Sequence, residues 1–206
     1  MIPPIYAKLG VRPVIHGSGT TTRYGGSLLR PEALEAMRDA SRALVNIDEL
    51  NAAAGAAIAR MLGAEAAFVT AGASSGLILQ AAACIAGDDP AKITRLPDTG
   101  GMRNEIVIQR AHRFAYDQAY RVAGGALVEI GLARRTQPFE LEEAITERTA
   151  AVAYLVSPFT SPPGTLTLEQ VVAVAHKPTS PSSWTPPRCC RRARTSRSSS
   201  AWAPTS

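Results

Sequence analysis

The sequence has few aromatic residues, few cysteines and no long apolar run. Aromatic residues make up 5% of the 206 residues, and there are three cysteines. No hydrophobic stretch is long enough to span a bilayer, and Met1–Gly10 lacks the charged start and apolar middle of a signal peptide. The sparse cysteines argue against a disulfide-stabilised secreted domain. We therefore expect a cytoplasmic protein with no membrane partner.

Several ligand-binding motifs are also missing. Neither the phosphate loop of ATP- and GTP-binding proteins nor the G-x-G-x-x-G motif of dinucleotide-binding proteins occurs, which argues against ATP and NAD. Cys189 and Cys190 are adjacent and have neither zinc-ligand spacing nor a second pair, so no metal site is predicted. Hydrophobic residues, many of them alanine, make up 46% of the chain, which is typical of a globular enzyme.

Acidic residues are absent from the last part of the chain, residues 178–206. This segment contains five arginines: Arg188, Arg191, Arg192, Arg194 and Arg197. They account for the net charge of +5, because residues 1–177 carry as many acidic as basic residues. One interpretation is a protein that binds RNA or an acidic partner through this Arg/Ser tail, with Trp184 and Trp202 stacking on bases. The neutral body disfavours nucleic acid, and we keep this function as the alternative.

The hydrophobic pattern of residues 31–177 predicts alternating helices and strands. Residues 11–30, rich in glycine, serine and threonine, indicate an extended arm. Helices are expected at Pro31–Leu44, Ser74–Ile85, Tyr116–Ala123, Glu140–Glu147 and Leu168–His176, with a further helix capped by Asp48 and ended by Gly63. Strands are expected at Ala66–Val69, Glu105–Gln109, Ala126–Ile130 and Ala151–Val156. Apolar strands separated by helical crossovers predict an α/β fold whose mostly parallel sheet has helices on both faces.

The alternation stops at Pro178, where a buried strand is due. Joining the last base of each codon to the first two of the next gives a different sequence for this tail. Trp184 followed by Thr185 then encodes aspartate, and Ser180–Trp184 allows a proline followed by an apolar strand. We hypothesise that residues 178–206 are a disordered frameshift product; chance in a low-complexity sequence is the alternative. Sequencing the gene downstream of codon 177 tests this.

The strongest chemical motif runs from Phe68 to Gly76, at the expected junction of a strand and a helix. Its small residues allow backbone N–H groups to approach an anion, and the helix dipole favours negative charge there. The serines add hydroxyl donors. The alternative is that small residues only permit tight packing of the strand on the helix.

Three further residues are candidates by position. His112 follows the strand that ends at Gln109, at the carboxyl edge where open α/β sheets bind ligands, and could stack on a flat ring. A histidine that is only hydrogen-bonded is the alternative. Arg23 in the arm and Ser157 after the strand that ends at Val156 are candidates for substrate contact.

Taken together, four stretches resemble pyridoxal-phosphate enzymes of the aspartate-aminotransferase fold (fold type I). The nearest group is the selenocysteine-synthase-like one: L-seryl-tRNA selenium transferase and its shorter relatives, which include D-glucosaminate-6-phosphate ammonia-lyase. The stretches are LGVRPVIHGSGTTTRYGGS, LGAEAAFVTAGASSGLILQAAACIAG, RLPDTGGMRNEIVIQRAHRFAYDQAYRVAGGALVEIG and ELEEAITERTAAVAYLV.

The resemblance implies a domain organisation and a cofactor. It implies an arm (1–30), the front part of the cofactor-binding large domain (31–177) and a foreign tail (178–206). Pyridoxal 5'-phosphate is the implied cofactor, its phosphate held by Ala71, Gly72, Ala73 and Ser74 and its ring covered by His112. The implied reaction is a lyase or transferase step, elimination or replacement of a β-substituent on an amino acid or phosphorylated amino-sugar acid. The intact enzyme is expected to be a homodimer.

The family's catalytic lysine has no counterpart here. Pyridoxal-phosphate enzymes carry the cofactor on a lysine as a Schiff base. The chain contains Lys8, Lys92 and Lys177, of which Lys92 is expected in a loop after the helix Ser74–Ile85. None lies where the family places this lysine, which comes after a further strand. No residue is therefore predicted to be catalytic, and the chain as written is predicted to be inactive.

Overall fold

The computed structural model describes residues 3–17, 21–156 and 163–176. The chain divides into two compact units, Met1–Val69 and Thr70–Ser206. The predicted tail and Ser157 lie outside the described residues.

The first unit is helical. Its elements are α1 (Pro4–Lys8), the 3-10 turn η1 (Thr22–Tyr24), α2 (Pro31–Ala40) and α3 (Ile47–Leu62). Helix α3 ends at Gly63 as predicted, because Gly63 adopts the left-handed conformation with φ 63°. Its N-cap is Asn46, whose side-chain oxygen accepts from the N–H groups of Asp48 (2.9 Å) and Glu49 (3.2 Å). The prediction that Asp48 caps this helix is therefore wrong by two residues.

The predicted strand Ala66–Val69 does not form. The side chain of Asn51 in α3 donates to the carbonyl of Val69 (3.0 Å) and accepts from its N–H (3.1 Å). These are the bonds that a neighbouring strand would otherwise make. One turn further along α3, a Cβ on Gly55 would lie 2.2 Å from the carbonyl oxygen of Ala67. The helix thus approaches the segment backbone to backbone and takes the place of a strand partner.

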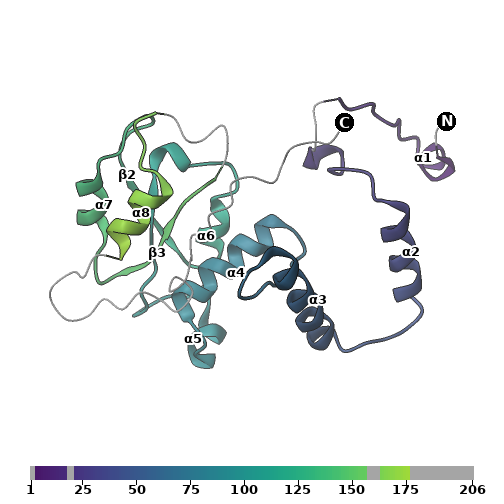
Figure 1. The fold of residues 1–206 in the computed structure, drawn as a ribbon, viewed down its shortest axis with the longest axis horizontal. Coiled ribbons are helices and arrows are strands. Elements are labelled where there is room, and N and C mark those ends of the chain that lie inside the picture. Colours follow the sequence, from purple (N-terminus) through teal and green to yellow (C-terminus); the bar gives the residue numbers. More distant parts are fainter. Residues whose placement is uncertain (1–2, 18–20, 157–162, 177–206) are drawn as a thin grey trace. The chain divides into compact units, whose positions relative to one another are not determined.

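The second unit contains a sheet of three parallel strands (Figure 1). Its elements are α4 (Ala73–Ala86), α5 (Pro90–Arg95), β1 (Glu105–Gln109), the 3-10 turn η2 (Arg110–His112), α6 (Gln118–Val122), β2 (Ala126–Ile130), α7 (Pro138–Ala144), β3 (Thr149–Ala153) and α8 (Leu168–Ala175). The strand order is β2-β1-β3, and Ile106 lies beside Leu127 on one side and Ala151 on the other.

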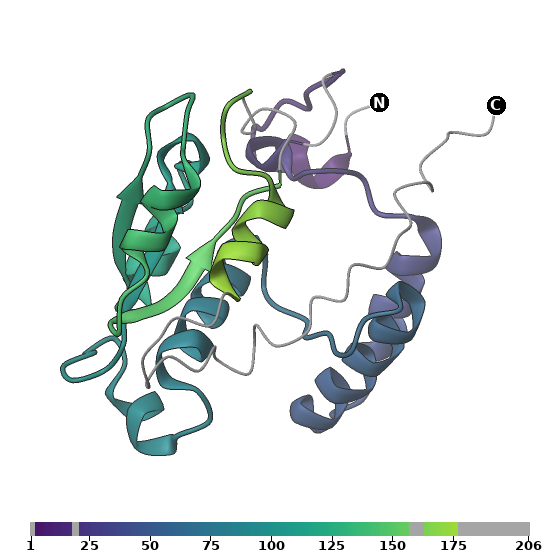
Figure 2. The same cartoon turned by 60° about the vertical axis from the view of Figure 1, so that its left-hand side comes forward.

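Each face of the sheet has its own apolar core. Val107 points into a cluster formed with α7 and α8, which contains Leu141, Val171 and Val174. Its neighbour Ile106 points the other way, to a cluster that includes Ala81 of α4. Figures 1 and 2 show the light-green helix α8 lying along β3. The predicted parallel sheet with helices on both faces is confirmed, because adjacent residues of a strand point to opposite faces and both are covered.

Element boundaries differ from the prediction where local hydrogen bonds decide them. Strands β1 and β2 have the predicted limits, whereas β3 begins two residues and ends three residues earlier. The predicted helices 31–44, 116–123, 140–147 and 168–176 are shorter or shifted, as the bounds above show. The segment around Lys92 is helix α5 rather than a loop. Asp89 caps this helix by accepting from the N–H groups of Ala91 and Lys92, and Pro90 occupies its first position.

Candidate functional site

The N-terminus of α4 is open and carries no side-chain cap. Its first helical hydrogen bond runs from the N–H of Gly76 to the carbonyl of Gly72 (3.1 Å). The preceding N–H groups, of Ala73 to Ser75, have no acceptor within the helix. Ala71, Gly72, Ala73 and Ser74 are all exposed, and a Cβ added to Gly72 would meet no heavy atom within 4 Å. Within the part of the chain that the structure describes, no side chain caps this end of the helix, so the residues present fit a phosphate group.

The turn into α4 depends on glycine and on the hydroxyl of Thr70. Gly72 has φ 148° and ψ 173°, a conformation that side-chain-bearing residues rarely adopt. The Thr70 hydroxyl donates to the carbonyl of Gly72 (3.0 Å). These two features fix the direction of the first N–H groups of α4.

His112 is fully buried at the end of η2, directly after β1. Its Nδ1 accepts from the N–H of Leu155 (3.5 Å), and its ring meets that of Tyr154 edge to face with centroids 4.5 Å apart. Its Nε2 has no hydrogen-bond partner among the described residues. The structure thus brings His112 to the segment that follows β3. The predicted stacking of this ring on a cofactor ring stays a prediction.

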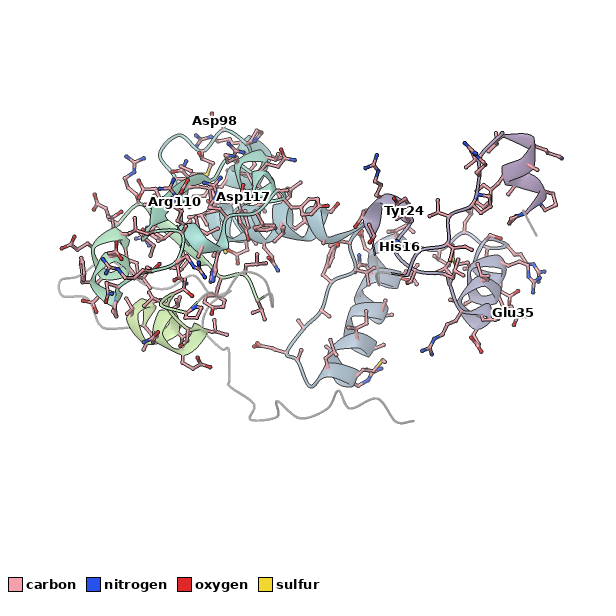
Figure 3. The ribbon with its side chains drawn as sticks, turned by 90° about the horizontal axis from the view of Figure 1, so that it is seen from above. His16, Tyr24, Glu35, Asp98, Arg110 and Asp117 are labelled. Atoms are coloured by element: carbon pink, nitrogen blue, oxygen red, sulfur yellow. The ribbon has the colours of Figure 1, made fainter. Side chains whose placement is uncertain are left out.

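Charged residues between β1 and β2 surround the His112 turn. Arg113 forms ion pairs with the buried Asp117 and with Glu129 of β2. Arg110, labelled with Asp117 in Figure 3, lies 3.9 Å from the same Glu129 carboxylate. The hydrogen bonds that Arg113 donates to the Asp117 carboxylate raise the pKa of Arg113. Burial alone would raise the pKa of Asp117, but hydrogen bonds from Arg113 and from the N–H of Phe114 lower it overall.

A buried glutamine on the other side of the His112 turn is hydrogen-bonded to the segment before α8. Gln109, the last residue of β1, donates from its side chain to the carbonyl of Leu166 (3.2 Å) and accepts from the Leu166 N–H (2.8 Å). The N–H of Thr136 holds the neighbouring carbonyl of Gly164 (2.9 Å). The chain segment before α8 is therefore hydrogen-bonded to the carboxyl end of β1 and to the loop that follows β2. Sequence reasoning missed Gln109 and Asp117; the four-residue spacing of Arg113 and Asp117 was the available signal for the ion pair.

The remaining predicted residues lie elsewhere. Arg23 is exposed in η1 of the first unit, inside a turn closed by a bridge between Thr21 and Gly26. The ring of Tyr24 in this turn lies 4.9 Å from the ring of His16, which precedes the turn (Figure 3). Arg23 and the N-terminus of α4 thus belong to different units. Ser157 is not described, so its predicted role stays a prediction.

Lys92, the described lysine of the second unit, lies at the opposite end of β1 from His112. Lys92 belongs to α5, which leads through residues 96–104 to the amino end of β1, whereas His112 follows the carboxyl end of that strand. Its ammonium lies 3.8 Å from the Asp89 carboxylate. Lys8 is exposed in α1 of the first unit, and Lys177 lies outside the described residues.

The buried state of His112 leads to a prediction about pH. Burial lowers the pKa of His112 from its ordinary value of 6.5. Between the lowered pKa of the folded state and 6.5, the unfolded chain binds more protons at this site than the folded chain, so stability falls as pH decreases through this range. We expect an NMR titration to give His112 a midpoint below pH 6.5, and His112→Asn to reduce the loss of stability between pH 7 and the folded pKa. A His112 signal that titrates at 6.5 or above would contradict this.

The fold and the site define a class: an α/β protein with a parallel sheet, an open helix N-terminus suited to an anion and a buried histidine at the carboxyl edge. No protein-family profile matches the chain. The chain is 37% identical over 179 residues to D-glucosaminate-6-phosphate ammonia lyase of Salmonella typhimurium (strain 14028s / SGSC 2262). The matched region covers 85% of this chain and 48% of the relative. A solved structure of D-glucosaminate-6-phosphate ammonia-lyase matches with a TM-score of 0.81 at 37% identity, over the same shares of the two chains.

A second relative has a different name. The 5'-C-glycyluridine monooxygenase-decarboxylase of a Streptomyces species is 38% identical over 157 residues, 74% of this chain and 39% of the relative. The chain therefore spans less than half the length of the curated relatives that it matches. No helix among the described residues is both long and apolar enough to cross a membrane.

Proposed function

We propose that this chain is part of a pyridoxal-phosphate-dependent lyase of the selenocysteine-synthase-like group, with fold type I, and that its described residues bind the cofactor without attaching it. The proposed substrate is an amino acid or a phosphorylated amino-sugar acid. The observation that carries the proposal is the uncapped N-terminus of α4, with Gly72 and three N–H groups free of helical acceptors. The likeness to an enzyme named for its action on a sugar phosphate supports a lyase.

The residues of this chain would bind and orient the cofactor. The N–H groups of Ala73, Ser74 and Ser75 would hold the phosphate, with the hydroxyl of Ser74 as a further donor. His112 would meet the ring or the substrate from the carboxyl edge of the sheet. When bound, pyridoxal phosphate supplies a ring that withdraws electrons from the substrate's α-carbon.

The two relatives bear on what this part of the enzyme does. A lyase and a monooxygenase-decarboxylase are matched at 37% and 38% identity. A region that is similar in proteins with such different reactions is better suited to binding a cofactor that they have in common than to determining which reaction takes place. We infer that the choice between elimination and other chemistry is made outside the described residues.

Titration with pyridoxal 5'-phosphate tests the proposal. We expect saturable binding in the micromolar range, observed as a change in the cofactor's absorbance, and competition by inorganic phosphate. Pyridoxal, which lacks the phosphate, should bind at least about ten-fold more weakly, the effect of losing charge-assisted hydrogen bonds. After borohydride treatment, mass spectrometry should find no cofactor attached to one specific lysine. Equal affinity for pyridoxal, or a single reduced lysine adduct, would refute the proposal.

A further inference from the structure

The three-residue turn that carries His112 is fastened at both ends. Before it, Gln109 bonds twice to the backbone of Leu166. After it, Arg113 pairs with Asp117 and Glu129. Within it, the imidazole is held by the N–H of Leu155. The turn that carries His112 is therefore held from three directions: by Leu166, by the Asp117 and Glu129 carboxylates, and by Leu155.

The hydrogen bond from Leu155 also decides which nitrogen of His112 carries the proton. A backbone N–H can only donate, so Nδ1 of His112 must be the unprotonated acceptor. In the neutral ring the proton then lies on Nε2, which is a donor. This donor is buried and has no partner among the described residues. Buried donors are nearly always satisfied in folded proteins, so this one points to an acceptor supplied by a ligand.

We propose that Asp117 is a positioning residue that, through Arg113, holds His112 with its Nε2–H directed at an anionic oxygen of the ligand. The inference rests on the proposed function for the identity of the ligand, but not for the geometry of the turn. The oxygen belongs either to the cofactor, as phenolate or phosphate, or to a substrate carboxylate.

Asp117 is better placed for this role than Glu129. Its side chain is 5% exposed, against 41% for Glu129. Its carboxylate accepts from Nε and Nη2 of Arg113 and from the N–H of Phe114 (3.2 Å), whereas Glu129 also faces Arg110. Asp117 therefore fixes both the Arg113 side chain and the backbone directly after it. Among the described residues, the charged groups around this turn are those of Arg110, Arg113, Asp117 and Glu129, and the charge of Arg121 also acts on Asp117.

The test compares Asp117→Asn with Glu105→Gln. Asparagine has nearly the shape of aspartate but lacks the charge that orders Arg113. The control breaks the ion pair of Glu105 with Arg148 (2.9 Å) at the amino end of the same strand β1, away from His112. Nitrogen-15 NMR of the imidazole rings reports the tautomer directly. The chain has three histidines, so His16→Gln and His176→Gln complete the assignment.

In the unmodified chain we expect His112 as the Nε2–H tautomer before any ligand is added. Pyridoxal 5'-phosphate should shift its Nε2 signal, and separate additions of inorganic phosphate and acetate distinguish a phosphate oxygen from a carboxylate. In Asp117→Asn the turn loses its anchor at Arg113, so the Leu155 N–H no longer meets Nδ1 in a fixed geometry and the tautomers should mix. Affinity for pyridoxal 5'-phosphate should then fall about ten-fold, as for one lost charge-assisted hydrogen bond. Asp117→Glu should restore the signal in part. Glu105→Gln should lower the melting temperature and leave His112 unchanged.

The outcomes separate the two proposals. If Asp117→Asn leaves the His112 tautomer as it is in the unmodified chain, the positioning role is wrong, whatever the ligand does. If the tautomer changes but pyridoxal 5'-phosphate binds to neither protein, the positioning role stands and the proposed function fails. Should Asp117→Asn not fold, Arg113→Lys keeps the positive charge while losing the two-pronged contact, and it must mix the tautomers in the same way.

Discussion

Gly72→Ala is expected to weaken the binding of pyridoxal 5'-phosphate by about 10- to 100-fold. With φ 148° and ψ 173°, Gly72 has a conformation that costs a residue with a side chain about 1–3 kcal/mol. The space around it is open, so the alanine would not clash; the backbone would instead relax and turn the first N–H groups of α4 away from a common point. Equilibrium titration with the cofactor measures the effect.

Gly87→Ala is the matched control for Gly72. Gly87 lies at the other end of the same helix, also has a positive φ (63°), and has no heavy atom within 4 Å of an added Cβ. Both substitutions should therefore lower stability by a similar amount, and only Gly72→Ala should change the affinity. Equal affinities for the two variants would show that the N-terminus of α4 does not hold the phosphate.

Gly124→Ala is expected to lower the free energy of unfolding by about 4 kcal/mol. Gly124 has φ 93°, and an added Cβ would lie 2.4 Å from the carbonyl oxygen of Pro97 and 2.6 Å from a methyl group of Thr99. Backbone strain and overpacking each cost about 1–3 kcal/mol, and here both apply. The residue lies ahead of β2, where its carbonyl accepts from Thr99 (3.2 Å) and Asn104 (3.1 Å), so little room exists for relaxation.

Gly101→Ala provides the comparison for Gly124. It has a positive φ of 75° but open space around it, and should cost only about 1 kcal/mol, the strain alone. Adding Thr99→Ala to Gly124→Ala removes the methyl clash but not the one with the Pro97 carbonyl, so most of the loss should persist. Denaturant unfolding followed by circular dichroism measures all four proteins. If Gly124→Ala lowers the free energy of unfolding no more than Gly101→Ala does, the loop around Gly124 shifts to accommodate the added methyl group.

The candidate site was only partly predictable from sequence. A run of small residues before an apolar helix can be recognised in the sequence, and this run predicted the open N-terminus of α4. His112 was found because a residue that follows a buried strand lies at the carboxyl edge of the sheet. Its hydrogen-bonding state was not predictable, because Leu155 lies 43 residues further along the chain. The same holds for Gln109 and Leu166, which are 57 residues apart and show no pattern that pairs them.

The sequence by itself determined the strands β1 and β2 to the residue, the parallel α/β arrangement and the end of α3 at Gly63. These features depend on local rules: unbroken apolar runs, crossovers long enough for helices, and a glycine that tolerates positive φ. Tertiary structure alone decided that Ala66–Val69 forms no strand and that Asn46 rather than Asp48 caps α3. A strand exists only if another backbone pairs with it, and around Val69 the side chain of Asn51 provides those bonds instead.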